Sequence, residues 1–243
     1  YLHDLYRFFK LSVRRHEFRD IFKEKLDLHH IPALSNVLYS EDILFPIADF
    51  YLKKERWNEA IEVYEEMETI GALQGRGAEY YQKLGYALQK NKKYAEAIDA
   101  YLKADTLKPD NIWNNRHLAI CYRLNRNYQA ALSYYKKVEE ATPEDTNVIF
   151  HIGSCLAELG QYEEAANYFF KLDFIESNCI KAWRGIGWCS FISRKYEQAM
   201  KYYEKIIEQK PLAIDYMNAG HVAWTMGDIQ KAAALYGKSI TAN

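Results

Sequence analysis

Residues 112–145, IWNNRHLAICYRLNRNYQAALSYYKKVEEATPED, contain two segments with helical periodicity. In the first segment, Leu118, Ala119 and Tyr122 recur at the spacing of one helix face. The second segment starts at Tyr128 and has the same kind of apolar face. It ends before Pro143, because proline cannot continue a helix and restricts the residue before it. The stretch therefore predicts two helices joined by a short turn at residues 126–128.

This helix–turn–helix unit recurs along the chain at a spacing of 34, 34, 34 and 33 residues. Each copy has an alanine in the second helix, an aromatic residue four positions later and a small residue twelve positions earlier. In chain order the three columns are Ala97, Ala131, Ala165, Ala199 and Ala232; Tyr101, Tyr135, Phe169, Tyr203 and Tyr236; and Gly85, Ala119, Gly153, Gly187 and Gly220. Such a period is typical of a helix–turn–helix solenoid. We expect the small residues to let two helices approach, and the aromatic residues to fill the gap to the next unit.

The pattern resembles the tetratricopeptide repeat (TPR) family over about residues 41–243. One unit keeps nearly the whole family pattern through Tyr81, Leu84, Gly85, Leu88, Ala97, Tyr101, Ala104 and Pro109. Trp183 stands at the family's tryptophan position. The resemblance implies an all-α, right-handed solenoid. We divide it into units at about 41–74, 78–111, 112–145, 146–179, 180–212 and 213–243.

Residues 1–40 carry no repeat columns and are expected to form N-terminal helices that cap the open end of the solenoid. A helix that binds a partner or a membrane surface is the alternative for this segment. Residues 71–77 contain three glycines and predict a longer loop between repeats, with a hinge as the alternative. Because the chain begins at Tyr1 and stops after the last expected helix, we interpret it as a piece of a longer protein.

The net charge of −1 gives no general attraction to nucleic acid or acidic membranes, so we expect no DNA partner. No apolar run approaches the roughly 20 residues that a membrane-spanning helix requires. The aromatic content of 15% argues against disorder.

Three of the four cysteines, Cys121, Cys155 and Cys189, occupy one column at 34-residue spacing. Ala87 and Val222 stand in the same column of the neighbouring units. We interpret the column as a small, buried packing position, because a free cysteine behaves as a small hydrophobic residue. Reduced thiols favour a cytoplasmic location.

The sequence contains no G-x-S-x-G, G-x-G-x-x-G, H-E-x-x-H or C-x-x-C motif. His117 and His151 share a column, but a metal site needs more than two ligands. We therefore predict that the protein is not an enzyme and has no catalytic residues, metal or cofactor.

In TPR proteins the first helices of the units form a concave groove that binds extended peptides or helices. The resemblance implies a groove here made of Gln82, Tyr86, Trp113, Arg116, His117, Ile120, Arg123, Asn147, Phe150, His151, Ser154, Lys181, Arg184, Trp188, Phe191, Met217, Asn218, His221 and Trp224. The set is rich in aromatic residues, arginine and histidine and contains no acid. Aromatic residues and arginine are enriched in binding hot spots. Arginine can also clamp a carboxylate. The expected partner is a protein or peptide with acidic groups and large apolar anchors.

One alternative and one exclusion concern this groove. Some of its aromatic residues could instead pack between neighbouring repeats. The specialised lysine–asparagine clamp of TPR proteins that bind chaperone tails is not matched. The corresponding positions are Gln82 and Tyr86, Arg116 and Ile120, and Phe150 and Ser154.

The leading hypothesis is a protein–protein interaction scaffold. Single-stranded nucleic-acid binding is an alternative, because basic and aromatic residues share one face. A regulatory or targeting arm of a larger enzyme is another. Self-association through the ends of the solenoid would make a homo-oligomer.

Overall fold

The computed structural model describes residues 40–71 and 76–242 of the chain. The expected N-terminal cap at residues 1–40 therefore lies, apart from Ser40, outside the described residues. The same is true of most of the glycine-containing loop at residues 71–77.

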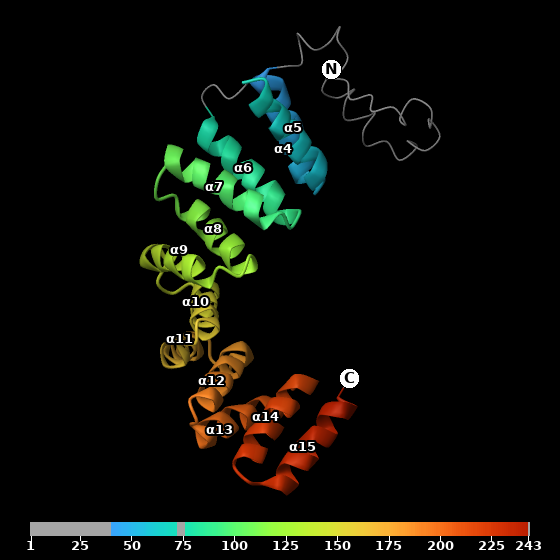
Figure 1. Ribbon diagram of the computed structural model, residues 1–243, viewed down its shortest axis with the longest axis vertical. Helices are drawn as coiled ribbons and strands as arrows, with labels where there is room; N and C mark the ends of the chain where they lie inside the picture. The colour runs from blue at the N-terminus through green and yellow to red at the C-terminus, as the bar shows by residue number, and fades with distance from the viewer. Residues whose placement is uncertain (1–39, 72–75, 243) are drawn as a thin grey trace, which may run out of the picture. The chain divides into compact units, whose positions relative to one another are not determined.

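The described residues form twelve consecutive helices, and the prediction of an all-α chain is confirmed. The helices are α4 (Glu41–Lys53), α5 (Trp57–Thr69), α6 (Gly77–Lys90), α7 (Tyr94–Leu107), α8 (Ile112–Leu124), α9 (Tyr128–Ala141), α10 (Thr146–Glu158), α11 (Tyr162–Ile175), α12 (Ile180–Ile192), α13 (Tyr196–Ile207), α14 (Ala213–Thr225) and α15 (Ile229–Thr241). Each expected repeat contains one even-numbered and one odd-numbered helix, which Figure 1 shows as successive pairs. In these described ranges, no helix has both the length and the apolar character that crossing a membrane requires.

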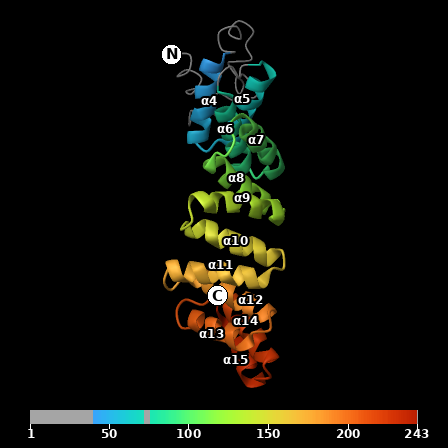
Figure 2. The same ribbon diagram turned by 90° about the vertical axis from the view of Figure 1, so that its left-hand side faces the viewer.

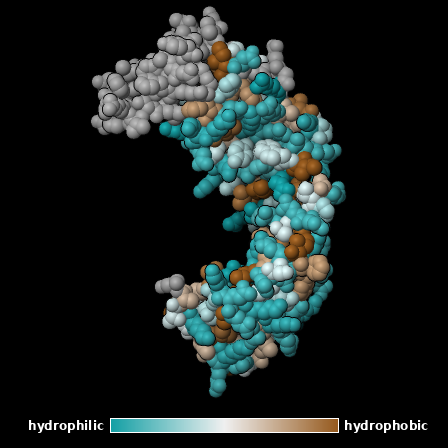
Figure 3. Space-filling model, turned by 180° about the vertical axis from the view of Figure 1, so that it is seen from behind, coloured by the Kyte–Doolittle hydropathy of each residue, from teal (hydrophilic) through white to brown (hydrophobic). Residues whose placement is uncertain are grey.

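The described residues divide into two compact bodies, one up to Asn114 and one from Asn115 onward, with the boundary near the start of α8. We call them the N-terminal body and the C-terminal body and describe each by itself. Within the C-terminal body, α9, α10 and α11 follow one another as layers (Figure 2). On the face shown in Figure 3, hydrophilic residues predominate and apolar ones form scattered patches.

In the N-terminal body, the first repeat is well packed. Pro46 lies inside α4 without ending it, and Met67 is fully buried at the position that Ala104, Val138, Leu172 and Ile206 hold in later repeats. The buried Tyr80 hydroxyl donates a hydrogen bond to the backbone oxygen of Tyr64, with an oxygen–oxygen distance of 2.6 Å. The two rings meet edge to face at 5.5 Å, so α6 is joined to α5 by both packing and a hydrogen bond.

The alanine column is completely buried, and the small and aromatic columns meet inside the same repeat. A Cβ atom added to Gly85 would lie 2.8 Å from the ring of Tyr101, and one added to Gly187 would lie 3.1 Å from the ring of Tyr203. Our expectation that the aromatic residues mainly fill the gap to the next unit was therefore incomplete. The small residue makes room first for the ring of its own unit, because the two helices of a repeat are antiparallel neighbours.

The turn between the two helices of each repeat contains a residue in the left-handed region of backbone conformation. After the first repeat these residues are Lys92 (φ 63°), Arg126 (φ 61°), Gly160 (φ 78°), Arg194 (φ 61°) and Gly227 (φ 84°). A residue with a side chain is strained there by an amount of order 1 kcal/mol, whereas glycine is not. The turn is thus set by helix packing, which is strong enough to hold lysine and arginine in this conformation.

The cysteine column is confirmed as a packing position. Cys121, Cys155 and Cys189 are buried and free. Burial raises the pKa of Cys121 to about 12 and the pKa values of Cys155 and Cys189 to about 11. These thiols are therefore uncharged and unreactive near neutral pH.

A pair of glycine substitutions tests the strain in the turns. Gly160→Ala should lower the free energy of unfolding by about 1 kcal/mol, because the turn requires a positive φ. Gly237→Ala is the control: it lies inside α15 with open space around its Cβ position, and should raise stability by about 0.5–1 kcal/mol. Urea unfolding of both variants measures the difference, and effects of the same sign would contradict this account.

Candidate peptide-binding site

Of the predicted groove residues, Gln82, Tyr86 and Trp113 lie in the N-terminal body. The Tyr86 ring lies 6.0 Å from Trp57 and 6.2 Å from Trp113, measured between ring centroids. These contacts support the alternative in which groove aromatic residues pack between repeats. The remaining candidates belong to the C-terminal body.

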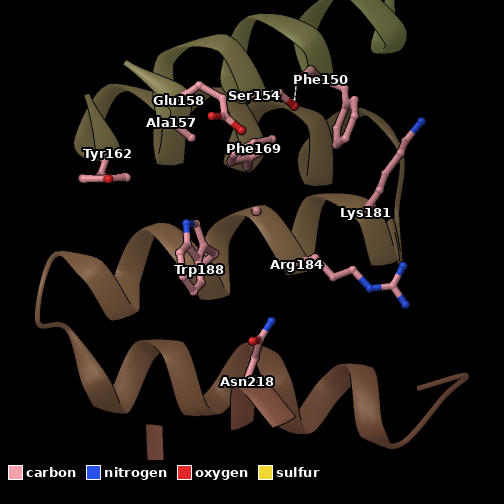
Figure 4. A pocket seen from close by; sticks show the side chains of 11 residues that line it. Phe150, Ser154, Ala157, Glu158, Tyr162, Phe169, Lys181, Arg184, Trp188 and Asn218 are labelled. Atoms are coloured by element: carbon pink, nitrogen blue, oxygen red, sulfur yellow. Dashed lines mark hydrogen bonds between the residues drawn. The ribbon is translucent and has the colours of Figure 1, made fainter. Parts of the chain in front are cut away.

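Within the C-terminal body, a pocket of about 620 Å³ opens between α10, α11, α12 and α14. It is lined by Phe150, Ser154, Ala157, Glu158, Tyr162, Phe169, Lys181, Arg184, Gly185, Trp188 and Asn218 (Figure 4). Phe150, Ser154, Lys181, Arg184, Trp188 and Asn218 were predicted groove residues. The structure thus brings side chains from three first helices to one cavity.

Trp188 lies at the centre of this pocket and is 42% exposed (Figure 4). One wall is aromatic, with the rings of Phe150 and Phe169 at 6.0 Å. Phe169 reaches the wall because the neighbouring position on α12 is Gly185, where a Cβ atom would lie only 2.5 Å from its ring. A large exposed tryptophan beside an aromatic wall is suited to holding an apolar side chain of a ligand.

Charged groups of both signs lie at the edges of the pocket. Lys181 lies 3.5 Å from Glu176, between side-chain nitrogen and oxygen, and 5.9 Å from the centre of the Phe150 ring. Glu158 is exposed at the end of α10, on the side of the pocket near Tyr162 in Figure 4. The expectation of an inner face without acids was therefore wrong for this pocket, because the last turn of α10 contributes a carboxylate.

Sequence reasoning missed five lining residues. Ala157 occupies the same column as Arg123 and Phe191, so extending that column would have found it. The others are Glu158, Tyr162, Phe169 and Gly185. Tyr162 and Phe169 come from the second helix of a repeat, which we had assigned entirely to packing.

The two arginines that we expected to clamp a partner's carboxylate are paired inside the chain. Arg184 donates from Nε to Oδ1 and from Nη2 to Oδ2 of Asp215, both at 2.7 Å, and Asp215 is fully buried. This hydrogen-bonded pairing raises the pKa of Arg184. Arg116 Nη2 lies 2.8 Å from Asp145 Oδ2. Both acids stand near the start of the following first helix, outside the columns that sequence reasoning compared.

Asp145 also caps α10. Its side chain accepts hydrogen bonds from the backbone nitrogens of Asn147 and Val148 at 3.0 and 3.1 Å. Burial alone would raise the pKa of Asp145, but the Val148 N–H and the Arg116 guanidinium hold it below its ordinary value. Arg116 thus links α8 to the beginning of the next repeat.

Arg123 differs from these arginines, because no ion pair with a carboxylate joins it to another part of the described chain, and its guanidinium interacts instead with Tyr135. Its Nε, the hydroxyl of Tyr135 and Nδ1 of His151 are all buried without a hydrogen-bond partner among the described residues. The His151 ring is stacked on Tyr135, with centroids 5.5 Å apart and planes 23° apart. Burial, followed by the charges of Arg123 and Lys181, lowers the pKa of His151 to about 4.

The other predicted residues do not line the pocket. Phe191 lies 6.2 Å from Trp188, between ring centroids, and His221 Nδ1 lies 2.8 Å from the Tyr236 hydroxyl. Trp224 is 59% exposed on α14. His117 and Ile120 are half-buried on α8, and Asn147 and Met217 are exposed on α10 and α14. In the part of the chain that the structure describes, no three His, Cys, Asp or Glu side chains are grouped so as to hold a metal.

The comparisons with known proteins identify the class of this fold. Family models for the tetratricopeptide repeat match residues 44–74, 78–111, 123–189, 180–211 and 216–243. The chain belongs to the tetratricopeptide repeat family and has its all-α solenoid fold. Among curated proteins, no sequence matches it.

Several solved structures share the fold. A tetratricopeptide repeat protein from Parabacteroides merdae ATCC 43184 has a TM-score of 0.70 and 19% identity, covering 84% of this chain and 80% of its own. YrrB, described as a TPR protein with an unusual peptide-binding site, has a TM-score of 0.60 and 21% identity over 70% of this chain and 88% of its own. MamA from Desulfovibrio magneticus RS-1 has a TM-score of 0.62 and 18% identity over 70% of this chain and 97% of its own.

The pair of Arg184 and Asp215 should be important for stability. Asp215→Asn should lower the free energy of unfolding by about 3 kcal/mol, because it leaves a half-buried guanidinium without its carboxylate. Glu204→Gln is the control: its ion pair with Lys231 is exposed, so the loss should stay below about 1 kcal/mol. Chemical unfolding distinguishes the two, and equal losses would contradict the assigned role.

His151 should make stability depend on pH. Its folded-state pKa of about 4 lies below the ordinary value of 6.5, so the unfolded chain binds more protons between these values. The folded state therefore loses stability as the pH falls from about 6.5 to about 4. His151→Phe keeps a ring against Tyr135 but cannot titrate, and it should lose less stability over this window. Parallel urea unfolding across the window tests this, and identical losses would contradict it.

Proposed function

We propose that this TPR array is a non-enzymatic scaffold that binds an extended or helical segment of a protein partner. The pocket around Trp188 in the C-terminal body is the proposed site. The observation that supports it is the exposure of Trp188 beside the aromatic wall of Phe150 and Phe169. Exposed tryptophan is costly in water and is a frequent centre of binding energy at protein interfaces.

The pocket chemistry favours a ligand with a large apolar or aromatic anchor. The volume of about 620 Å³ accommodates one or two such side chains. Lys181 and Glu158, at opposite sides of the pocket, favour a ligand with an acidic group near Lys181 and a basic group near Glu158. The ligand is thus of mixed charge rather than uniformly acidic.

Selection from a random peptide library displayed on phage tests the proposal without requiring knowledge of the partner. Peptides selected on the wild-type protein should carry a shared apolar or aromatic anchor. Trp188→Ala should weaken their binding by about tenfold or more in isothermal titration calorimetry, because the anchor loses its main contact.

Trp224→Ala provides the matched control. Trp224 is even more exposed than Trp188 but does not line the pocket, so its removal should leave affinity nearly unchanged. Equal losses in both variants, or no selectable peptide, would contradict the assignment of the pocket.

A further inference from the structure

The side chains that line the Trp188 pocket follow two neighbouring first helices along their length. On α12, Lys181 and Trp188 stand seven residues apart, which places them on one face of the helix. Phe150, Ser154 and Glu158 recur at every fourth position of α10 and line the opposite side (Figure 4). Because α10 and α12 also contact each other directly, the pocket is a narrow furrow between these two helices.

The charges in the furrow are separated along its length. Lys181 lies at one end, and Glu158 lies toward the other, near the level of Trp188 (Figure 4). The ion pair of Lys181 with Glu176 is long, at 3.5 Å, and both side chains are exposed to solvent, so a ligand carboxylate competes with it easily. Arg184, the other cation of the pocket, is already held by a buried carboxylate. The furrow therefore offers one available positive charge, at a fixed distance from the exposed tryptophan.

That distance selects the conformation of a ligand. Seven residues of α-helix separate Lys181 from Trp188 by about 10 Å along the axis of α12. In a polyproline-II segment, every third side chain lies on the same side, about 9 Å further along. In a β-strand, side chains on one side are about 7 or 13 Å apart, and neither value matches. A helix about 10–12 Å in diameter is too wide to enter a furrow between two helices that contact each other.

We propose that the Trp188 pocket binds a polyproline-II segment in which an acidic residue stands three positions from an aromatic or large apolar anchor. The anchor packs on Trp188, and the carboxylate reaches Lys181. Glu158 disfavours an acid directly beside the anchor, through repulsion between like charges. Grooves lined by aromatic side chains suit polyproline-II segments, which lose little conformational entropy on binding. This inference rests on the proposed function, because it specifies the ligand of the same pocket.

The first experiment measures the charge and spacing with peptides selected from the phage library on the wild-type protein. Changing the acidic residue of a selected peptide to its amide should weaken binding to the wild type by about three- to tenfold in isothermal titration calorimetry. The same change should have little effect on binding to Lys181→Gln. Lys201→Gln is the matched control, because Lys201 is exposed on α13 and does not line the pocket, so this variant should behave as the wild type does.

Moving the acid from the third position to the position beside the anchor tests the role of Glu158. The move should weaken binding to the wild type several-fold, and Glu158→Gln should remove part of that loss. Selected peptides that carry the anchor without an acid at the predicted spacing would overturn the inference. Equal effects of the amide change on the wild type and on Lys181→Gln would overturn it as well.

The second experiment tests the conformation of the ligand. Proline at both positions between the acid and the anchor should maintain the affinity or raise it several-fold, because it fixes the backbone near polyproline-II geometry. Glycine at the same positions should lower the affinity, since the free peptide is then more flexible. A loss of tenfold or more with proline would overturn the polyproline-II conformation, because proline is incompatible with a helical ligand and removes hydrogen-bond donors from a strand.

The two proposals fail in different ways. Binding that is lost in Trp188→Ala but does not depend on Lys181 or on the spacing of an acid would refute this inference and leave the proposed function standing. Failure to select any peptide would overturn both.

Discussion

In four repeats, an aromatic ring of the second helix packs against a glycine of the first helix. A Cβ atom added to Gly85 would lie 2.8 Å from the ring of Tyr101, and one added to Gly187 would lie 3.1 Å from the ring of Tyr203, so only a very small residue, glycine or Ala119, fits this column. This contact sets how near the two helices of a repeat approach. The distance then sets the turn, which is tight enough to require a left-handed residue even where arginine occupies it. The regular columns of the sequence are the consequence of this one packing constraint.

The pocket arises where the columns depart from their usual residues. In one column, His117 and His151 are followed by Gly185, and the ring of Phe169 occupies the space that a side chain would fill. In another column, Ser154 is followed by Trp188. The small side chain of Ser154 on α10 leaves space beside the large side chain of Trp188 on α12. A pocket therefore forms from ordinary repeat packing through a few changes of residue, without any change in the fold.

The sequence was sufficient for the fold because periodic packing leaves a periodic pattern. The helix pairs and the buried cysteine column follow from residue size at fixed spacing. The site was only partly predictable, since it depends on contacts between columns. Asp145 and Asp215 come from the starts of the following helices, and Phe169 comes from a second helix. Comparing equivalent positions among first helices could not reveal these neighbours.

The internal ion pairs change how the charge of this surface is understood. An arginine on the ligand-facing side of a TPR array is easily taken as a clamp for a partner. Here Arg184 is held by a buried carboxylate and joins two repeats. Reversing its charge would place two carboxylates together in a buried site, so any loss of binding would be inseparable from loss of structure. Lys181 has no such buried partner: its side-chain nitrogen lies 3.5 Å from Glu176 and 5.9 Å from the centre of the Phe150 ring. Lys181 is not held by a buried carboxylate, so its charge is the one that the proposed binding of a ligand beside Trp188 would use.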